Sequence, residues 1–514
     1  MIRTILKSSE YRRRFKQGAK AVLCVMLVFL LTSCSALISI NESGYDSIPS
    51  ELPTPDVETP LAPVGDVTEG EIYRANIYSI SSDGLTLAPS IRVMWLTGAD
   101  SLSERLSEEA LRTPTLPGGA PIAPANSALA YVEDGNGIAT ISIRPGEHMS
   151  EGKSQAFLAS AMASTLLEIE EISGVNVLVS GRAMEYMSLP IGTVTRENAS
   201  LEKMIQDASD DFSHVSSGSQ TEWRLVRNVT LYYPSSDGKY VVPEIKRLQF
   251  DTSDYASSIV RALSSRGDDE FLLPGVPLAS DALTEKCRYV QENGENILEI
   301  RFSGDIVNAI DESAVERWQF LASVVLSTTT FCPNTDGVRV FVGKSMVTSV
   351  PDKGGEYMSF ANGVIRRNDF AGRIAVPVKV YFENIAGKLS YEVKAVPLSE
   401  ADSVRTRLRL LMEGPDTYGF VRTVPEGILP SDILGTGVSG SIASVNLSSE
   451  AYRLAQELTK EEEKMFVYSI VNTLTEIDGI NGVRIYIDGR ETDTLAGNIW
   501  LRGVLLPNPG LSAD

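Results

Sequence analysis

Residues able to carry out acid–base, nucleophilic or metal chemistry are few and scattered in this chain of 514 residues. The two histidines, His148 and His214, are too few for a histidine-rich metal site, and no Cys-x-x-Cys pair is present to hold zinc. Ser150 and Lys153 have the Ser-x-x-Lys spacing of penicillin-binding enzymes, but no Lys-Thr-Gly accompanies them. The Gly-Lys-Ser at 343–345 lacks the first glycine of a phosphate-binding loop. We therefore expect no catalytic, cofactor-binding or metal-binding residues and no enzymatic activity.

Paired carboxylates are the one reaction chemistry that the composition leaves open, because two acids can hydrolyse a glycan without a histidine. The recurring acids favour a structural role, since Asp83 and Asp237 each stand in a Ser-Ser-Asp-Gly turn sequence. Glu168 and Glu476 occupy equivalent positions at the end of a repeated helix, but Phe331 stands at the third such position. A shared carboxylate site is thus disfavoured, and a peptidoglycan-hydrolysing function remains an alternative.

The N-terminal segment carries signals for export and lipid attachment. Basic residues precede an apolar run at 21–31 that is shorter than the roughly 20 residues a transmembrane helix needs. The following Leu31-Thr32-Ser33-Cys34 resembles a bacterial lipobox, a signal in which cleavage before the cysteine is followed by its lipidation. We therefore expect residues 1–33 to be removed and Cys34 to hold the chain on the outer face of the cell membrane.

The chain left after this cleavage is strongly acidic. Loss of seven basic residues and one acidic residue changes the net charge from −21 to about −27. A surface of this charge argues against nucleic acid as a partner, because phosphate backbones are bound by Lys and Arg. Cys287 and Cys332 are the cysteines that remain beyond Cys34. A disulfide between these two is permitted outside the cytoplasm, and two buried thiols are the alternative.

One phrase recurs three times along the chain: a helical pattern, a glycine and a β-branched strand. The strands are 174–179, 337–342 and 482–487. Since the copies lie about a domain's length apart, they indicate tandem modules rather than a solenoid. Hairpin signals precede each copy, with Asp-Gly at 83–84 and 237–238.

The pattern predicts an α/β (α+β) fold in which each module has the order β-β-α-β-β-α-β. Two amphipathic helices would cover a small twisted sheet and leave an edge or face open to a neighbour. Residues 35–70 have five prolines, many acids and no Lys or Arg, which is typical of an extended tether. The predicted boundaries are a signal peptide at 1–33, a tether at 34–70, module 1 at 71–189, a linker at 190–226, module 2 at 227–350, a linker at 351–376 and module 3 at 377–514.

The third repeat resembles the GerM domain, also called the sporulation and spore germination domain. The matching stretches are Val380-Tyr-Phe, Leu410-Leu-Met-Glu-Gly-Pro415, Val424-Pro-Glu-Gly427, Ser469-Ile-Val-Asn-Thr-Leu-Thr-Glu476 and Val483-Arg-Ile-Tyr-Ile-Asp-Gly489. Repeat two is similar more loosely, with Ser-Thr-Thr-Thr-Phe at 327–331, and repeat one is the most divergent. Family members resemble lipoproteins with two such modules, so a third copy is a departure.

The resemblance implies a fold similar to the ring-building motif, which occurs in proteins that form membrane-associated rings. GerM-like lipoproteins of spore-forming Gram-positive bacteria support the apparatus that bridges mother cell and forespore and affect later germination. The resemblance therefore implies a membrane-anchored scaffold that binds envelope proteins, with an oligomer or peptidoglycan as further partners. Peptidoglycan binding without assembly is the alternative, and the resemblance brings no catalytic residues.

Overall fold

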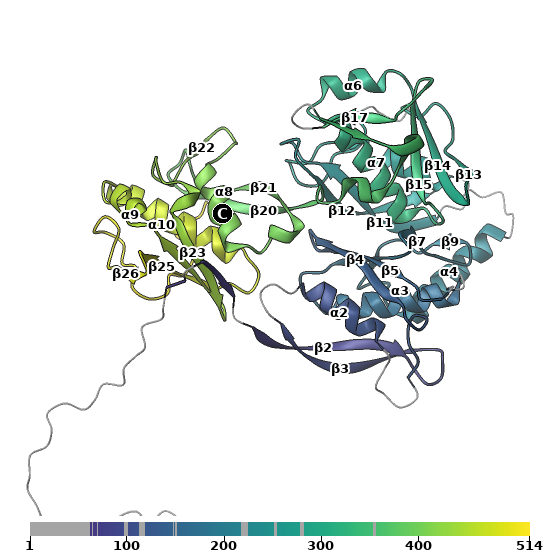
Figure 1. The fold of residues 1–514 in the computed structure, drawn as a ribbon, viewed down its shortest axis with the longest axis horizontal. Helices are drawn as coiled ribbons and strands as arrows, with labels where there is room; N and C mark the ends of the chain where they lie inside the picture. The colour runs from purple at the N-terminus through teal and green to yellow at the C-terminus, as the bar shows by residue number, and fades with distance from the viewer. Residues whose placement is uncertain are drawn as a thin grey trace, which may run out of the picture. The chain divides into compact units, whose positions relative to one another are not determined.

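The computed structural model describes residues 62–513 except 64, 69, 97–100, 113–118, 148, 150–151, 217–224, 251–253, 278–281 and 353–355. The chain divides into two compact units, Met1–Pro60 and Leu61–Asp514, and all the described residues lie in the second unit. The predicted signal peptide and Cys34 lie outside the described residues. We call residues 71–216, 225–370 and 375–513 modules 1, 2 and 3; their elements are labelled in Figure 1.

Module 1 consists of a hairpin, a helix, a strand pair, a long helix and a closing strand. These elements are β2 (Glu71–Ile80), β3 (Leu87–Leu96), α2 (Leu102–Leu111), β4 (Ala128–Gly135), β5 (Ile138–Arg144), α3 (Lys153–Leu166) and β6 (Gly174–Val179). Short elements follow: β7 (Arg182–Ala183), β8 (Glu185–Tyr186), β9 (Leu189–Pro190), β10 (Val194–Thr195) and the helix α4 (Leu201–Ser216).

Module 2 repeats this order and inserts one short helix before the long one. Its elements are β11 (Leu225–Pro234), β12 (Val241–Phe250), α5 (Tyr255–Ala262), β13 (Arg288–Glu292), β14 (Glu295–Phe302), α6 (Ile306–Glu312), α7 (Arg317–Phe331) and β15 (Gly337–Val342). The connection to module 3 contains β16 (Ser345–Met346), β17 (Ser349–Pro351), β18 (Tyr357–Ser359), η2 (Ala361–Gly363), β19 (Val364–Ile365) and η3 (Arg367–Phe370).

Module 3 has the same order, again with a short helix before the long one. Its elements are β20 (Ala375–Asn384), β21 (Leu389–Pro397), η4 (Leu398–Glu400), α8 (Val404–Glu413), β22 (Phe420–Val421), η5 (Pro430–Asp432), β23 (Ile433–Ser439), β24 (Ile442–Leu447), α9 (Ser449–Ala455), α10 (Lys460–Thr475), β25 (Gly482–Ile487) and β26 (Arg490–Glu491). A capping box begins its long helix: the Thr459 hydroxyl accepts from the Glu462 amide, and the Glu462 carboxylate accepts from the Thr459 amide.

Each module has a five-stranded mixed sheet, and its three longer strands pair in the same way in all three modules. The first two strands are antiparallel and the last two are parallel, so that Ile138 lies opposite Gly174, Ile297 opposite Gly337 and Ile442 opposite Gly482. A parallel pair needs a crossover, and the long helix provides it in every module. The recurring glycine therefore occupies the same position in the register of three equivalent sheets.

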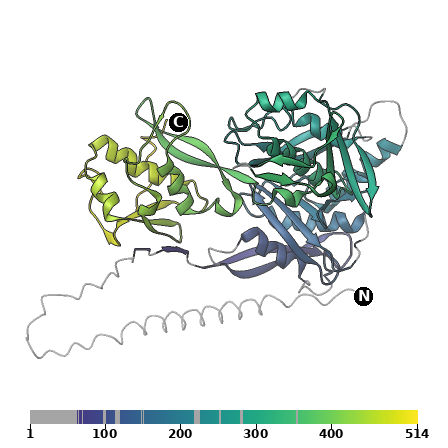
Figure 2. The same cartoon turned by 45° about the horizontal axis from the view of Figure 1, so that its top comes forward.

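The opening hairpins do not join these mixed sheets. β2–β3, β11–β12 and β20–β21 form separate ladders, and the first strand of each hairpin packs on the long helix of its module. In module 1, Figures 1 and 2 show α3 between the hairpin and the mixed sheet. A helix covered on two sides must be apolar nearly all round, as α7 is, with every residue from Trp318 to Phe331 buried. The α/β fold class is as predicted, but the opening hairpin of each module forms a sheet separate from the mixed sheet.

The predicted Asp-Gly turns close the first two hairpins. Asp83 Oδ1 accepts from the amide of Leu85 at 2.7 Å, and Asp237 Oδ1 accepts from that of Lys239 at 2.9 Å. Gly84 has φ +65°, a left-handed backbone that a glycine adopts without steric cost. Both recurring aspartates thus have the structural role expected of them.

A returning segment covers one edge of each mixed sheet. β10 pairs with β6, β19 with β15, and the chain at Leu505 bridges Val483 of β25. In all three modules this segment follows a glycine with positive φ, namely Gly192, Gly363 and Gly503. The segment after the last strand of the mixed sheet thus pairs with that sheet in modules 1 and 2, and the C-terminal segment does so in module 3.

Part of the predicted linker at 190–226 is folded. Helix α4 spans Leu201–Ser216 and buries Leu201, Met204 and Ala208, and it packs on α3. These apolar residues fall at helical spacing in an otherwise polar segment, and their burial stabilises a helix there. Each module also has its own apolar core, clustered around its long helix.

Candidate binding surface

The two equivalent glutamates at the helix ends make structural contacts. Glu168 accepts from the Tyr78 hydroxyl at 3.0 Å, and Glu476 accepts from the equivalent Tyr381 hydroxyl at 2.6 Å. Each of these pairs ties an opening hairpin to the end of the long helix. Within the described residues, no group of His, Cys, Asp and Glu is arranged to hold a metal ion.

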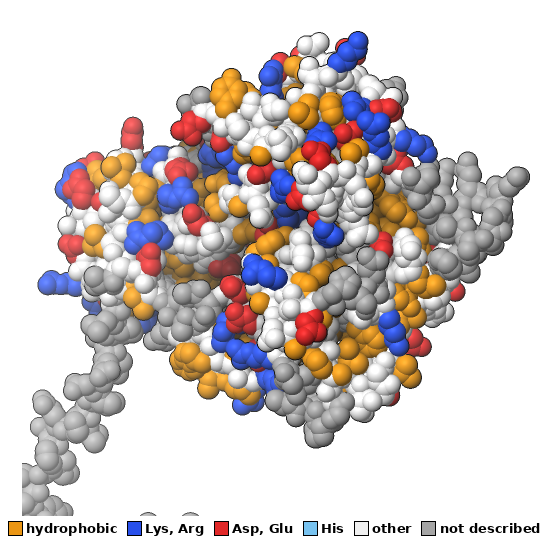
Figure 3. All heavy atoms as spheres, turned by 45° about the vertical axis from the view of Figure 1, so that its right-hand side comes forward, with side chains coloured by type: hydrophobic (Ala, Val, Ile, Leu, Met, Phe, Trp, Pro, Cys, Tyr) orange, Lys and Arg blue, Asp and Glu red, His pale blue; other side chains and the backbone are white. Residues whose placement is uncertain are grey.

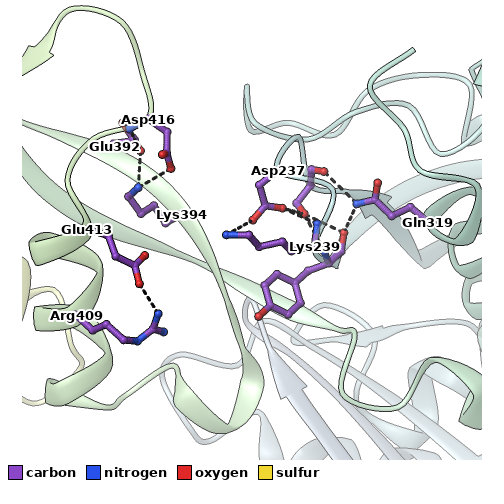
Figure 4. Close-up of polar contacts among 10 residues, drawn as sticks. Asp237, Lys239, Gln319, Glu392, Lys394, Arg409, Glu413 and Asp416 are labelled. Atoms are coloured by element: carbon purple, nitrogen blue, oxygen red, sulfur yellow. Dashed lines mark hydrogen bonds and ion pairs between the residues drawn. The ribbon is translucent and has the colours of Figure 1, made fainter. Parts of the chain in front are cut away.

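A second repeated contact escaped the sequence analysis. In module 3, Lys394 on β21 lies between Glu392, at 3.1 Å, and Asp416, at 2.6 Å (Figure 4). Module 2 repeats it with Lys246 between Glu244, at 3.0 Å, and Asp268, at 2.5 Å. Burial alone would lower the pKa of both lysines, but the flanking carboxylates raise it. The Glu-x-Lys on the second hairpin strand of both repeats was the available signal.

Modules 1 and 2 are joined by a buried charge cluster. Arg367, in η3, is 7% exposed and donates to the Thr330 hydroxyl at 2.7 Å, to the Tyr232 hydroxyl at 2.6 Å and to Glu133 on β4 of module 1. Burial would lower the pKa of Arg367, but Glu133 and Tyr232 hold it well above its usual value. Tyr232 is the counterpart of Tyr78 and Tyr381. Because Phe331 replaces the helix-end glutamate in module 2, its tyrosine is available to bind Arg367 instead.

The two remaining thiols lie in module 2. Cys332 is buried at the end of α7, Cys287 is partly buried, and both are free cysteines in this structure. Burial raises the pKa of Cys287 to about 12 and that of Cys332 still further. The two sulfur atoms are not bonded in this structure, and both the disulfide and the pair of buried thiols stay predictions. His148 lies outside the described residues, and His214 falls in α4, where its side chain is not described.

A strand from the predicted tether occupies the outer edge of module 3. β1 (Gly65–Thr68) pairs in parallel with β23, with Gly65 opposite Gly435 and Thr68 opposite Val438. Residues 34–70 are predicted to form an extended tether, and within this range residues 65–68 are a strand paired with module 3. Its proline-rich, acidic composition could not bury a core, but strand addition needs only backbone groups and a bare edge.

Side chains fix this added strand in place. Asp66 forms an ion pair with Arg405 at 2.8 Å and accepts from the Thr436 hydroxyl at 2.7 Å. The hydrogen bond from Arg405 is the main cause that lowers the pKa of Asp66. The Asn446 amide, itself buried, donates to the Pro63 carbonyl at 3.1 Å. The edge therefore recognises both the backbone and one acidic side chain of the strand.

On the face drawn in Figure 3, acidic and basic side chains are interspersed among the described residues. Of the helices described here, none is long and apolar enough to cross a bilayer. A hollow of about 250 Å³ beside α4 is lined by Lys203, Asp207 and Arg227 among others, and Asp207 is ion-paired with Lys203.

Three modules of one fold, each with a mixed sheet and a separate hairpin, define a tandem-repeat protein. Residues 379–493, within the third module, match the family model Germane, described as sporulation and spore germination.

Two solved structures from Bacillus subtilis are similar to this chain. The tandem GerMN domains of the sporulation protein GerM are 17% identical over 56% of this chain and 99% of that chain, with a TM-score of 0.23. The first GerMN domain alone is 21% identical over 26% of this chain and 97% of that chain, with a TM-score of 0.22. Among curated protein sequences, none matches this chain.

Proposed function

We propose that this protein is a lipid-anchored scaffold on the extracytoplasmic face of a Gram-positive cell membrane, where it acts by binding during sporulation or spore germination. The match of residues 379–493 to the sporulation and spore germination family supports a role in these processes. The mode of action rests on one observation. The edge strand β23 pairs with the added strand β1 along the backbone, and Asp66 of β1 forms an ion pair with Arg405. The module folds offer contact surfaces, and tandem copies on one chain would raise avidity for a multi-subunit envelope complex, such as a channel.

The role does not require a reaction centre. The helix-end and turn carboxylates hold structural hydrogen bonds, so a hydrolytic pair would need other residues. Protein partners in the envelope are the first expectation, and peptidoglycan is a further one. Cys34 supplies the anchor in this proposal.

Gene deletion in the source bacterium, with heat-resistant spores and germination scored, tests the role. We expect a sporulation or germination defect that the wild-type gene restores. A Cys34→Ala gene should release the protein from the membrane fraction and fail to restore it. Normal spore yield and germination after deletion would contradict the proposal. Binding of the purified chain to isolated peptidoglycan, with release of soluble muropeptides from it, would favour the hydrolase alternative.

A further inference from the structure

The three modules differ in what lies along the outer edge of the mixed sheet. On β4 of module 1, Glu133 is held by Arg367, and Gly135 lies against the Leu398 side chain. On β13 of module 2 the edge carries charged side chains, with Arg288 paired to Glu299. Charged residues along an open edge oppose strand pairing. Module 3 is the one whose outer edge, among the described strands, is extended by another strand.

Two glycines make this difference. A Cβ atom added at Gly435 would lie 2.3 Å from the Pro63 carbonyl oxygen, and one at Gly437 would lie 3.2 Å from that of Val67. The nearest atoms to both positions belong to residues 63–67. Neither glycine has a positive φ, so the backbone itself would accept a side chain. The bare edge is therefore matched to the close approach of an extended strand.

The added strand is short and weakly covered. β1 has four residues, and Val67 is 52% exposed. Residues 69 and 70 alone separate it from β2 of module 1. A second copy of the chain carries the same strand and the same edge, so it can make the same pairing with β23. Exchange of identical elements between protomers is a low-cost route to association.

We propose that the β23 edge of module 3 is an exchangeable strand-docking site, filled within one chain by residues 63–68 and in an assembly by the same residues of a second copy. The strand precedes module 1 and its acceptor lies in module 3. Exchange can therefore be reciprocal between two copies, which closes a dimer, or sequential along several copies. This inference rests on the binding role proposed above, because it names the partner of that binding surface.

Cysteine trapping in the full chain, purified in detergent, tests the exchange. One copy carries Asp66→Cys and a differently tagged copy carries Thr436→Cys; the side-chain oxygens of these residues are 2.7 Å apart. After mixing and mild oxidation, a disulfide-linked peptide joining positions 66 and 436, identified by mass spectrometry, can form only between copies. The chain without engineered cysteines gives the background from the native thiols.

We expect this link in the mixture, in a yield that rises with protein concentration. Adding Gly435→Val to the Thr436→Cys copy should lower the yield at least tenfold, whereas Leu434→Ala on the same strand should leave it unchanged. Thermal melting of both variants checks that module 3 stays folded. A link that forms when both cysteines are in one chain, but not in the mixture, would overturn the exchange, and no link in either sample would overturn the docking site. Neither result depends on spore phenotypes, which test the role separately.

Discussion

The buried charge cluster between modules 1 and 2 gives the sharpest stability prediction. Glu133→Gln removes the negative charge that faces Arg367, whose side chain is 6% exposed. An uncompensated charge in such a site costs about 3–5 kcal/mol. The chain offers a matched control, because the adjacent Arg366 pairs with Glu295 at 2.7 Å with both side chains about half exposed. Glu295→Gln should therefore cost about 0–1 kcal/mol.

Urea denaturation followed by circular dichroism measures the free energy of unfolding of both variants, and hydrogen exchange of β4 and η3 locates the opening. A second change, Arg367→Met in the Glu133→Gln chain, should recover part of the lost stability, because an apolar pair leaves no buried charge. If Glu133→Gln costs no more than Glu295→Gln, or if the double variant is less stable than the single one, Arg367 does not hold the junction as argued.

Three further predictions concern groups with defined partners. Glu463 accepts hydrogen bonds from the amides of Leu495, Ala496 and Asn498. Burial alone would raise the pKa of Glu463, but these hydrogen bonds lower it. The carboxylate therefore stabilises the fold above a pH of about 4.3, and this stabilisation is lost as the pH falls through the pKa of the folded state. Glu463→Gln should thus flatten the acid side of a melting-temperature profile, whereas the exposed Glu461→Gln should not. Tyr381→Phe, which loses the bond to Glu476, should cost about 1 kcal/mol in urea denaturation, and a change below about 0.3 kcal/mol would contradict that structural role. Cys287 and Cys332 should react with Ellman's reagent only after unfolding; fast reaction of the native chain would show that burial does not protect them.

Local sequence signals were enough to predict the modules and many of their elements. Asp-Gly turns need a left-handed residue, and the capping box at Thr459 satisfies its own helix end, so both are encoded within a few residues. The recurring Gly174, Gly337 and Gly482 were predictive because all three occupy one sheet position. The GerM resemblance rested on the third repeat, and the match at 379–493 bears this out.

The features missed are those that join residues distant in sequence. β1 pairs with a strand more than 300 residues away, and its composition alone indicates a tether. Arg367 fell in a predicted linker, and nothing local identifies Glu133 as its partner. The hairpin and mixed sheet were merged in the prediction because strand patterns do not say which strands pair. Strand addition and buried ion pairs depend on tertiary proximity, which a single sequence does not give.

Divergence among the three modules follows the contacts that each one makes. Where modules 1 and 3 keep a glutamate at the helix end, module 2 has Phe331, and its tyrosine binds Arg367 at the junction with module 1. Where modules 1 and 2 have an outer edge that is covered or charged, module 3 has Gly435 and Gly437. Module 3 is also the one that matches the GerM family model. The same fold thus makes different contacts in different copies. Modules 1 and 2 are joined through Arg367 and Glu133, and module 3 has a sheet edge with which a further strand pairs.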